Sequence, residues 1–310
     1  MANRDCPTIF SNEMTGTRTM GRTVFVNGQW LDETAATISI FDRGFLFADA
    51  IYEVTAVADG KLIDFKGHTD RLKRSLETLG IPMPVAEGEL LALHQEIARR
   101  NGITHGLVYL QISRGAEDRN FIYTDGLRPT IVMFTQPRTI LANPGWERGI
   151  TMKTAPDGRW AHRQIKTVQL LYSSMAKMEA LREGYDDVLF VEDGLITESG
   201  SANFHIITKD GILITRDLSN ALLHGITRAS VLDLGARAGL ETRQAAVTLE
   251  EAKNAEEAFI TDSISFVMPV VSIDGHPVGL GKPGPATAKL RKLYIEDRLA
   301  TGINIAERAA

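Results

Sequence analysis

The sequence has a single cysteine, Cys6, so no disulfide can form within the chain. Its 39 acidic and 34 basic residues leave a formal net charge of −5 without any block of lysine or arginine, which argues against a nucleic-acid or anionic membrane partner. No stretch approaches the ~18 apolar residues of a membrane-spanning helix, and the first residues lack the pattern of a secretory signal. These absences predict a cytoplasmic protein.

Several cofactor and catalytic motifs are missing as well. The chain contains no Walker-type GK[ST] sequence and no paired-cysteine or HExxH zinc pattern. The segment GLGKPG at 279–284 matches G-x-G-x-x-G, but it follows a predicted hairpin and contains Pro283, so we interpret it as a loop. The segment 199–201 lacks the spacing of a serine nucleophile elbow. Dinucleotide, zinc and serine-hydrolase chemistry therefore have little support.

One pattern recurs along the chain: an apolar run, then Asn-Gly or Asp-Gly, then a second apolar run. These dipeptides supply the positive φ angles of tight turns, so each copy predicts an antiparallel hairpin. Isolated hairpins are marginally stable, so we expect them to share sheets. The five predicted hairpins lie at 24–31, 54–63, 188–197, 206–215 and 270–278.

Helical patterns lie between the hairpins, with apolar residues three and four positions apart. The segment 167–184 places Val168, Leu171, Met175, Met178 and Arg182 on one face and ends at Gly184, a residue suited to a helix C-terminus. Hairpins mixed with helices, without regular βαβ alternation, predict an α+β fold. The five predicted helices span 68–80, 87–100, 167–184, 226–239 and 286–299.

Composition suggests two domains behind a short tail. Residues 1–21 are polar and have no apolar period. The stretch 135–149 is rich in proline, glycine and polar residues, which is typical of a linker. We therefore expect an amino-terminal α/β domain at 22–138, a linker at 139–149 and a larger domain at 150–310. Sites favour domain interfaces, so a cleft there is the expected place for chemistry.

Three residues are candidates for chemistry, although each also has an ordinary structural interpretation. Lys166 lies next to Ile165 at the start of an apolar helix face, where a lysine either extends its amine to solvent or holds it in a pocket. Glu198 follows a hairpin strand, where a carboxylate is usually solvated. Thr227 is typical of a helix N-cap, and a helix N-terminus also binds anions.

Taken in order, the segments around these residues carry a more specific signal. HTDRL, IKTVQLL with AKMEA, ITESGSANFHI and LHGITRASVL occur in that order along the chain. This order resembles the fold-type-IV pyridoxal-phosphate aminotransferases. The resemblance runs from about Thr23 to Leu299 and is closest to the D-amino acid aminotransferases, through 41–54, 109–120 and the Lys166 segment. It implies a two-domain α+β enzyme whose carboxy-terminal domain binds pyridoxal 5′-phosphate.

The resemblance also implies roles for single residues. Lys166 matches the lysine that forms a Schiff base with the cofactor, and Glu198 matches the carboxylate that bonds the pyridine nitrogen. Tyr52 and Arg119 match residues on the side that binds the substrate carboxylate. In the family a loop of a second subunit completes this pocket, which implies a homodimer. The residues that match the phosphate-binding set are Arg71, Ile226, Thr227 and Ser263.

The substrate-side loop departs from its closest relatives at one position. D-amino acid aminotransferases similar to this chain often carry Arg-x-His there, whereas this loop reads Arg119-Asn120-Phe121. A phenylalanine cannot donate a hydrogen bond to a carboxylate, although an arginine can do so with two N–H groups. Amines without a carboxylate therefore become plausible substrates.

The leading hypothesis is transfer of an amino group from a D-amino acid, such as D-alanine or D-glutamate, to a 2-oxo acid. The alternatives are an (R)-selective amine or branched-chain aminotransferase, a lyase of the aminodeoxychorismate type, and a small-molecule-binding protein without catalysis. Removal of the Cα proton leaves an electron pair that the cofactor accepts. Lys166 must then be a neutral amine to carry that proton.

Overall fold

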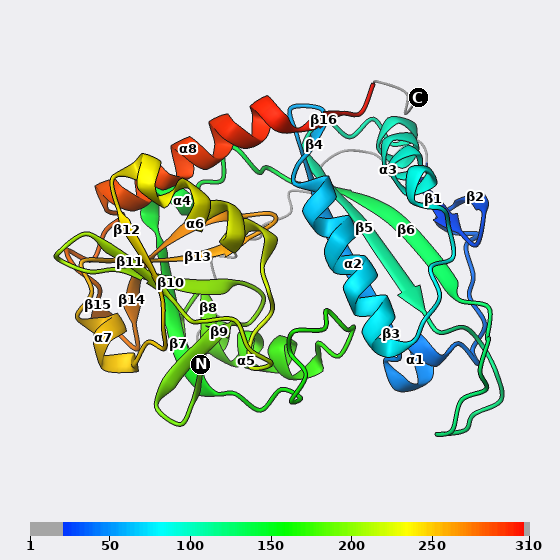
Figure 1. Cartoon of the computed structure of the whole chain (residues 1–310), viewed down its shortest axis with the longest axis horizontal. Coiled ribbons are helices and arrows are strands. Elements are labelled where there is room, and N and C mark those ends of the chain that lie inside the picture. Colours follow the sequence, from blue (N-terminus) through cyan, green and yellow to red (C-terminus); the bar gives the residue numbers. More distant parts are fainter. Residues whose placement is uncertain (1–20, 307–310) are drawn as a thin grey trace, which may run out of the picture.

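The computed structural model describes residues 21–306, in which two β-sheets stand side by side in separate lobes (Figure 1). The first sheet has the strand order β16-β4-β3-β5-β6-β1-β2, and all the pairings between its strands are antiparallel. Its strands are β1 (Thr23–Val26), β2 (Gln29–Asp32), β3 (Ala50–Ala58), β4 (Lys61–Leu62), β5 (Gly106–Ser113), β6 (Thr130–Pro137) and β16 (Ile303–Asn304). The tail predicted at 1–21 lies, except for Gly21, outside the described residues.

The second sheet is mixed and follows the order β12-β11-β10-β13-β14-β7-β8-β9, with β15 paired to β14. Three of its pairings are parallel, namely β11 with β12, β14 with β7 and β7 with β8. Its strands are β7 (Ile150–Pro156), β8 (Asp187–Glu192), β9 (Leu195–Ser199), β10 (Asn203–Ile207), β11 (Ile212–Thr215), β12 (Glu241–Gln244), β13 (Glu257–Asp262), β14 (Phe266–Ile273) and β15 (His276–Pro277).

All five predicted hairpins are present, and four of their turns show the predicted backbone conformation. Asn27, Asp59, Asp193 and Asp274 have φ angles between 48° and 51°, and each is followed by a glycine that also has positive φ. These left-handed conformations are cheap for Asn, Asp and Gly and costly for other residues. The α+β fold class expected from the hairpins is therefore confirmed.

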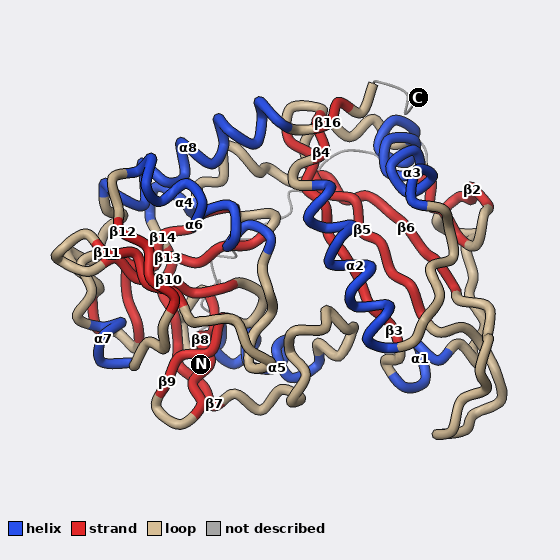
Figure 2. Tube along the Cα trace, viewed as in Figure 1, coloured by secondary structure: helices blue, strands red, loops and turns tan. Residues whose placement is uncertain are grey.

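Helices α2 and α3 lie on one side of the first sheet, whereas the second sheet has helices on both sides, with α7 opposite α6 and α8 (Figure 2). α2 and α3 pack on the first sheet through a core that includes Leu72, Leu76 and Ile97, and α6 and α8 pack on the second through Val231 and Leu290. The helices are α1 (Arg43–Phe47), α2 (Phe65–Leu79), α3 (Glu87–Arg100), α4 (Gly145–Arg148), α5 (Leu171–Arg182), α6 (Ile226–Ala238), α7 (Leu249–Lys253) and α8 (Pro285–Thr301).

The helix predicted at 167–184 begins later than expected, at Leu171. The residues before it pair with β3: the Val168 N–H donates to the Ala50 carbonyl at 3.1 Å, and Thr167 forms a bridge with Ile51. This pairing holds the segment extended and delays the helix. The predicted apolar face is exposed in the single chain, since Leu171 and Met175 are 75% and 62% accessible.

The two lobes are joined along one side by α8 (Figure 1). The Arg291 guanidinium on α8 donates to the carbonyls of Ile140 and Leu141 in the predicted linker. Beyond α8, β16 pairs with β4 of the first sheet. We propose that residues 139–149 separate the two domains. Residues 303–304, although they follow the carboxy-terminal domain, complete the sheet of the amino-terminal domain.

Candidate active site

A cavity of about 390 Å³ lies between the lobes and is lined by both of them. This volume is within the usual range of pockets for small cofactors. Arg119 does not line it. The other site residues predicted from the sequence do, namely Tyr52, Arg71, Lys166, Glu198, Ile226, Thr227 and Ser263.

Lys166 lies in the loop that connects β7 to α5 (Figure 2). The Tyr52 N–H donates to the Lys166 carbonyl at 3.0 Å, so the backbone is fixed to β3. Its neighbour Ile165 is buried in the first core. The Lys166 amine enters the cavity, where Nζ donates to the Tyr52 hydroxyl at 3.2 Å and lies 4.2 Å from the centre of its ring. The pocket interpretation of Lys166 is thus the one that the structure supports.

Tyr52 is held by a row of aromatic rings across the first sheet. Its ring stacks on Tyr109, with centroids 5.6 Å apart, and Tyr109 stacks on Phe134 at 4.5 Å. Side chains alternate between the two faces of a strand, so Tyr52 and Val54 of β3 line the cavity while Glu53 lies on the side of α2. The sheet therefore fixes the ring that contacts the Lys166 amine.

Arg71, on α2, is buried and held by Glu53, a residue that the sequence did not single out. Nε and Nη2 of Arg71 donate to the two Glu53 carboxylate oxygens, each at 2.8 Å, and Nη1 donates to the His224 carbonyl at 3.1 Å. His68 Nδ1 lies 2.7 Å from Glu53 Oε2. Burial alone would raise the pKa of Glu53, but the Arg71 guanidinium and His68 hold that pKa well below its usual range. Glu53 is therefore a fixed anion behind Arg71.

The start of α6 forms another wall of the cavity, and one detail differs from expectation. Gly225 is the N-cap residue of this helix, so Thr227 is its second residue and not its cap. Because Gly225 has no side chain, no side-chain cap occupies the N–H groups of the first turn. Ser263, which also lines the cavity, has its hydroxyl 3.4 Å from His68 Nε2. Open N–H groups, Arg71 and two hydroxyls together suit a phosphate.

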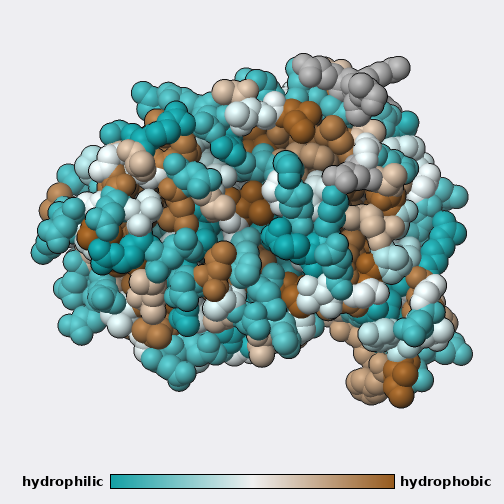
Figure 3. Space-filling view, viewed as in Figure 1, coloured by the Kyte–Doolittle hydropathy of each residue, from teal (hydrophilic) through white to brown (hydrophobic). Residues whose placement is uncertain are grey.

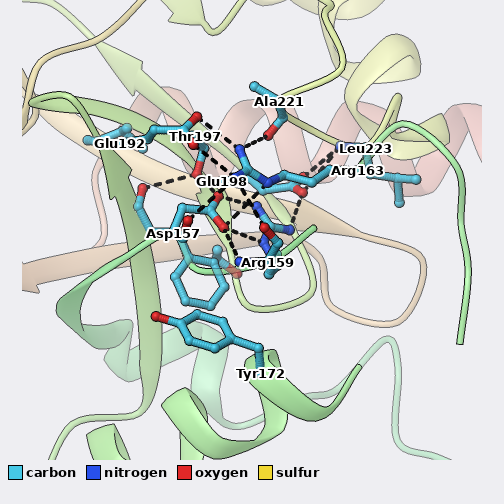
Figure 4. A network of polar contacts seen from close by, with 12 residues as sticks. Asp157, Arg159, Arg163, Tyr172, Glu192, Thr197, Glu198, Ala221 and Leu223 are labelled. Atoms are coloured by element: carbon cyan, nitrogen blue, oxygen red, sulfur yellow. Dashed lines mark hydrogen bonds and ion pairs between the residues drawn. The ribbon is translucent and has the colours of Figure 1, made fainter. Parts of the chain in front are cut away.

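Glu198, on β9, is buried and hydrogen-bonded on both oxygens (Figure 4). Oε1 accepts from Arg159 Nη1 at 2.5 Å, and Oε2 accepts from Asn203 Nδ2 at 2.9 Å. The Leu223 N–H lies 3.1–3.2 Å from both oxygens. Burial raises the pKa of Glu198, and the Arg159 charge opposes that rise. These three donors fix the position of the carboxylate in the cavity wall.

Arg159, which donates to Glu198, was not predicted as a site residue, because no local sequence pattern distinguishes it from a surface arginine. Arg159 belongs to a cluster with Asp157, Arg163 and Glu192 around Glu198 (Figure 4). The cluster holds three carboxylates and two guanidinium groups, which leaves one negative charge at the cavity wall. That charge suits one further cation, such as a protonated pyridine nitrogen.

Arg119 lies away from this cavity, on the loop between β5 and β6 that projects from the first lobe (Figure 1). Its guanidinium carbon lies 5.6 Å from the rings of Phe47 and of Phe121. Phe121 and Ile122 are 78% and 80% exposed, and brown side chains mark the tip of this projection in Figure 3. Within one chain Arg119 is therefore not part of the wall of the cavity that Lys166 enters.

The cavity thus fits pyridoxal 5′-phosphate by the chemistry of its donor set. An anion site lies at Arg71 and the first turn of α6, and an unbalanced carboxylate lies at Glu198. The Lys166 amine lies on the same cavity wall as Tyr52. Three of the five Arg71 N–H groups are used by Glu53 and His224 among the described residues, so two remain for a ligand.

The chain belongs to the class IV aminotransferases, whose family model matches residues 50–273. Pyridoxal phosphate is the cofactor of this class, and one solved structure of similar fold, a branched-chain amino acid aminotransferase, contains pyridoxamine 5′-phosphate. The family, the enzyme class and the cofactor predicted from the sequence are therefore confirmed. Among residues 21–306, no helix is both long enough and apolar enough to cross a bilayer.

Two groups of known proteins resemble the chain. It is 36% identical to a D-alanine aminotransferase of Bacillus licheniformis, over 86% of this chain and 94% of the relative. It is 33% identical to one of Listeria monocytogenes, over 88% and 95%. The branched-chain amino acid aminotransferase of Escherichia coli has a TM-score of 0.83 at 22% identity, over 90% of this chain and 95% of that one. At this identity the solved structure establishes the fold and not the substrate.

Proposed function

We propose that the protein transfers an amino group from a D-amino acid, of the D-alanine or D-glutamate type, to a 2-oxo acid. The observation that carries this proposal is that Lys166, Glu198 and Arg71, widely separated in the sequence, line one cavity. The D-alanine aminotransferases that match most of the chain support the D-amino acid as donor.

The residues of the cavity would divide the work as follows. Bound pyridoxal phosphate supplies an electron sink for the pair left at Cα. Lys166 holds the cofactor and moves the proton between the substrate Cα and the cofactor C4′. Tyr52, hydrogen-bonded to Lys166 Nζ, keeps the amine on the cavity side. Glu198 retains the proton on the ring nitrogen by a charge-assisted hydrogen bond.

The phosphate would be bound at the opposite end by charge and dipole together. Arg71 supplies the positive charge, and Glu53 keeps its guanidinium fixed. The first-turn N–H groups of Ile226 and Thr227 belong to a helix N-terminus, which favours an anion. The Ser263 hydroxyl completes the set. These contacts would anchor the phosphate, and Lys166 lines the same cavity.

The substrate carboxylate would be bound by Arg119 of a second copy, so the proposal includes a homodimer. Its support is that Arg119 lies on a projecting loop outside the cavity of its own chain. The exposed Leu171 and Met175 of α5 offer an apolar surface for the partner. Met175→Lys should therefore lower the mass measured in solution, whereas Leu280→Lys, at a residue that is 79% exposed, should not. An unchanged mass for Met175→Lys would place the interface elsewhere.

A panel of donors tests the proposed substrate class. D-alanine, D-glutamate, L-leucine and (R)-1-phenylethylamine are each mixed with the purified enzyme, and the half-reaction rate is followed by the cofactor absorbance. D-alanine or D-glutamate should react fastest. A preference for L-leucine or the amine would favour the branched-chain or amine alternative. Release of more than one equivalent of pyruvate per active site from aminodeoxychorismate, without any amino acceptor, would favour the lyase. The cytoplasmic location stays a prediction from the sequence.

A further inference from the structure

The loop after β7 carries a buried carboxylate that does not line the cavity. The Asp157 side chain is fully buried, and Asp157 is not among the residues that line the cavity. Its Oδ1 accepts from Arg159 Nε at 2.9 Å, and its Oδ2 accepts from Arg159 Nη2 at 2.6 Å. The Thr197 hydroxyl donates to Oδ2 at 2.6 Å. Asp157 therefore fixes the plane of the Arg159 guanidinium by two parallel hydrogen bonds.

The remaining edge of that guanidinium faces the site. Arg159 Nη1 donates to Glu198 Oε1 at 2.5 Å, so one planar group bridges two buried carboxylates (Figure 4). A lysine could not do this, because its single ammonium group has no such fork. Bridging matters because a buried carboxylate without a cation takes up a proton. Once protonated, Glu198 would donate to a ring nitrogen and could no longer accept its proton.

The charge of Arg159 would by itself repel a pyridinium group, and Asp157 offsets it. Asp157 also lies 3.5 Å from Arg163 Nε, and Arg163 pairs with Glu192 at the half-exposed edge of the cluster. With Asp157 ionised, the cluster keeps one net negative charge beside the cavity. Without it, the same groups would be neutral before any cofactor bound.

We propose that Asp157 and Arg159 form a positioning pair for Glu198. Arg159 favours the ionised carboxylate, and Asp157 orients Arg159 and offsets its charge, so that Glu198 can hold a protonated ring nitrogen. The inference rests on the assignment of Glu198 to that nitrogen, made above. It adds two residues that are linked to Glu198 and not to the Lys166 amine. Arg159 donates to Glu198 directly, and Asp157 acts through Arg159. It depends on the cofactor and not on which amino donor the enzyme uses.

The test compares two ligands that differ only at the ring nitrogen. Pyridoxamine 5′-phosphate and its 1-deaza analogue form no covalent bond with Lys166, so their dissociation constants from the apoenzyme can be measured by calorimetry at pH 7. Wild type should bind pyridoxamine phosphate more tightly. The preference for pyridoxamine phosphate is the dissociation constant of the deaza analogue divided by that of pyridoxamine phosphate. Asp157→Asn should reduce this ratio by about tenfold or more, because the charge-assisted contact between Glu198 and the ring nitrogen is weakened. Binding of the deaza analogue should change little.

Glu192→Gln is the matched control. It removes the same charge from the same cluster, but at a side chain that is 40% exposed, where solvent screens it. The ratio should change less than about threefold. If Asp157→Asn is not folded, Arg159→Lys replaces it and should also narrow the ratio. Equal loss of both ligands, or an unchanged ratio, would overturn the pair as a positioning device.

Glu198→Gln separates this inference from the assignment on which it rests. If Glu198→Gln narrows the ratio and Asp157→Asn does not, Glu198 keeps its role and only the pair is rejected. If Glu198→Gln leaves the ratio unchanged, the assignment of Glu198 to the ring nitrogen fails. If Glu198→Gln and Asp157→Asn both reduce the ratio of the two dissociation constants and Glu192→Gln does not, the pair acts through Glu198 as proposed.

Discussion

Glu53 binds the Arg71 guanidinium with both of its carboxylate oxygens, each 2.8 Å from a different nitrogen. The pair joins β3 to α2 and is almost completely buried. Removing one partner of such a pair leaves an uncompensated charge in the interior, which typically costs about 3–5 kcal/mol. Glu53 therefore acts on both the stability of the first lobe and the anion site that Arg71 provides.

Glu53→Gln should lower the free energy of unfolding by a few kcal/mol and weaken binding of pyridoxal phosphate. The exposed pair Lys66–Asp70 on the same helix is the control, and Asp70→Asn should cost no more than about 1 kcal/mol. Urea unfolding and cofactor titration measure both effects. If Glu53→Gln and Asp70→Asn had the same free energy of unfolding, the role given to Glu53 would be contradicted.

The same carboxylate predicts how stability depends on pH. The pKa of Glu53 is lowered from its ordinary value of 4.5, so folded Glu53 resists a proton that the unfolded chain accepts. Its stabilising contribution is therefore complete above about pH 4.5 and declines as the pH falls. Wild type should lose more stability between pH 7 and pH 4 than Glu53→Gln does. Urea unfolding at the two pH values measures this difference. If wild type and Glu53→Gln lose the same free energy of unfolding between pH 7 and pH 4, other groups cause the loss of stability.

Lys166 should carry the cofactor covalently. Borohydride reduction of the yellow holoenzyme, followed by peptide mapping, should place the phosphopyridoxyl group on Lys166. Lys177 also lines the cavity, but its amine is occupied by Asp187 at 2.9 Å and by Ser201 at 3.0 Å. Lys166→Ala should keep the fold and lose nearly all turnover. A label on Lys177, or none, would refute the assignment.

Gly225→Ala should weaken cofactor binding through Asn203. A Cβ at Gly225 would lie 1.9 Å from Asn203 Oδ1, and Asn203 Nδ2 is tied to Glu198 and to the Leu223 carbonyl at 2.9 Å each. Displacing Asn203 loses a charge-assisted hydrogen bond, so the dissociation constant should rise by roughly tenfold. Gly88→Ala, where nothing lies within 4 Å of the new methyl group, should leave it unchanged. If the dissociation constant of the cofactor were unchanged in Gly225→Ala, Asn203 could be displaced without weakening cofactor binding.

Arg119→Ala should affect donors according to whether they carry a carboxylate. A bidentate charge-assisted contact contributes about 1.5–3 kcal/mol, so kcat/KM for D-alanine should fall by roughly 10- to 200-fold. (R)-1-phenylethylamine has no carboxylate and should be affected little. The ratio of the two losses cancels general damage to the fold. Equal losses would give Arg119 a structural role in its loop.

Much of this architecture follows from local sequence patterns. The Asn-Gly and Asp-Gly turns at Asn27, Asp59, Asp193 and Asp274 place the hairpins because few other residues adopt their φ angles cheaply. Helix ends at Gly80 and Gly239 follow for the same reason. These features depend on a few neighbouring residues, and a sequence displays them directly.

Features that depend on distant partners could not be predicted in this way. The start of α5 is delayed by β3, more than a hundred residues upstream, and the α6 cap is a glycine although Thr227 has the usual cap chemistry. Arg159 meets Glu198 across 39 positions, and Glu53 meets Arg71 across 18. Tertiary folding alone brings these charges together. The resemblance predicted residues that line the cavity, with the exception of Arg119, but not the carboxylates Glu53 and Asp157 that hold two of its arginines.

The pairing of β16 with β4 has a consequence for the order in which the protein is made. A ribosome releases β4 early, but the strand that covers its free edge, Ile303–Asn304, emerges only after the whole second sheet. Until then the Lys61–Leu62 edge exposes unpaired backbone groups, which other chains can join. The amino-terminal lobe is therefore most prone to pair with other chains before β16 has been synthesised, and we expect chaperones to bind mainly to this part of the nascent chain.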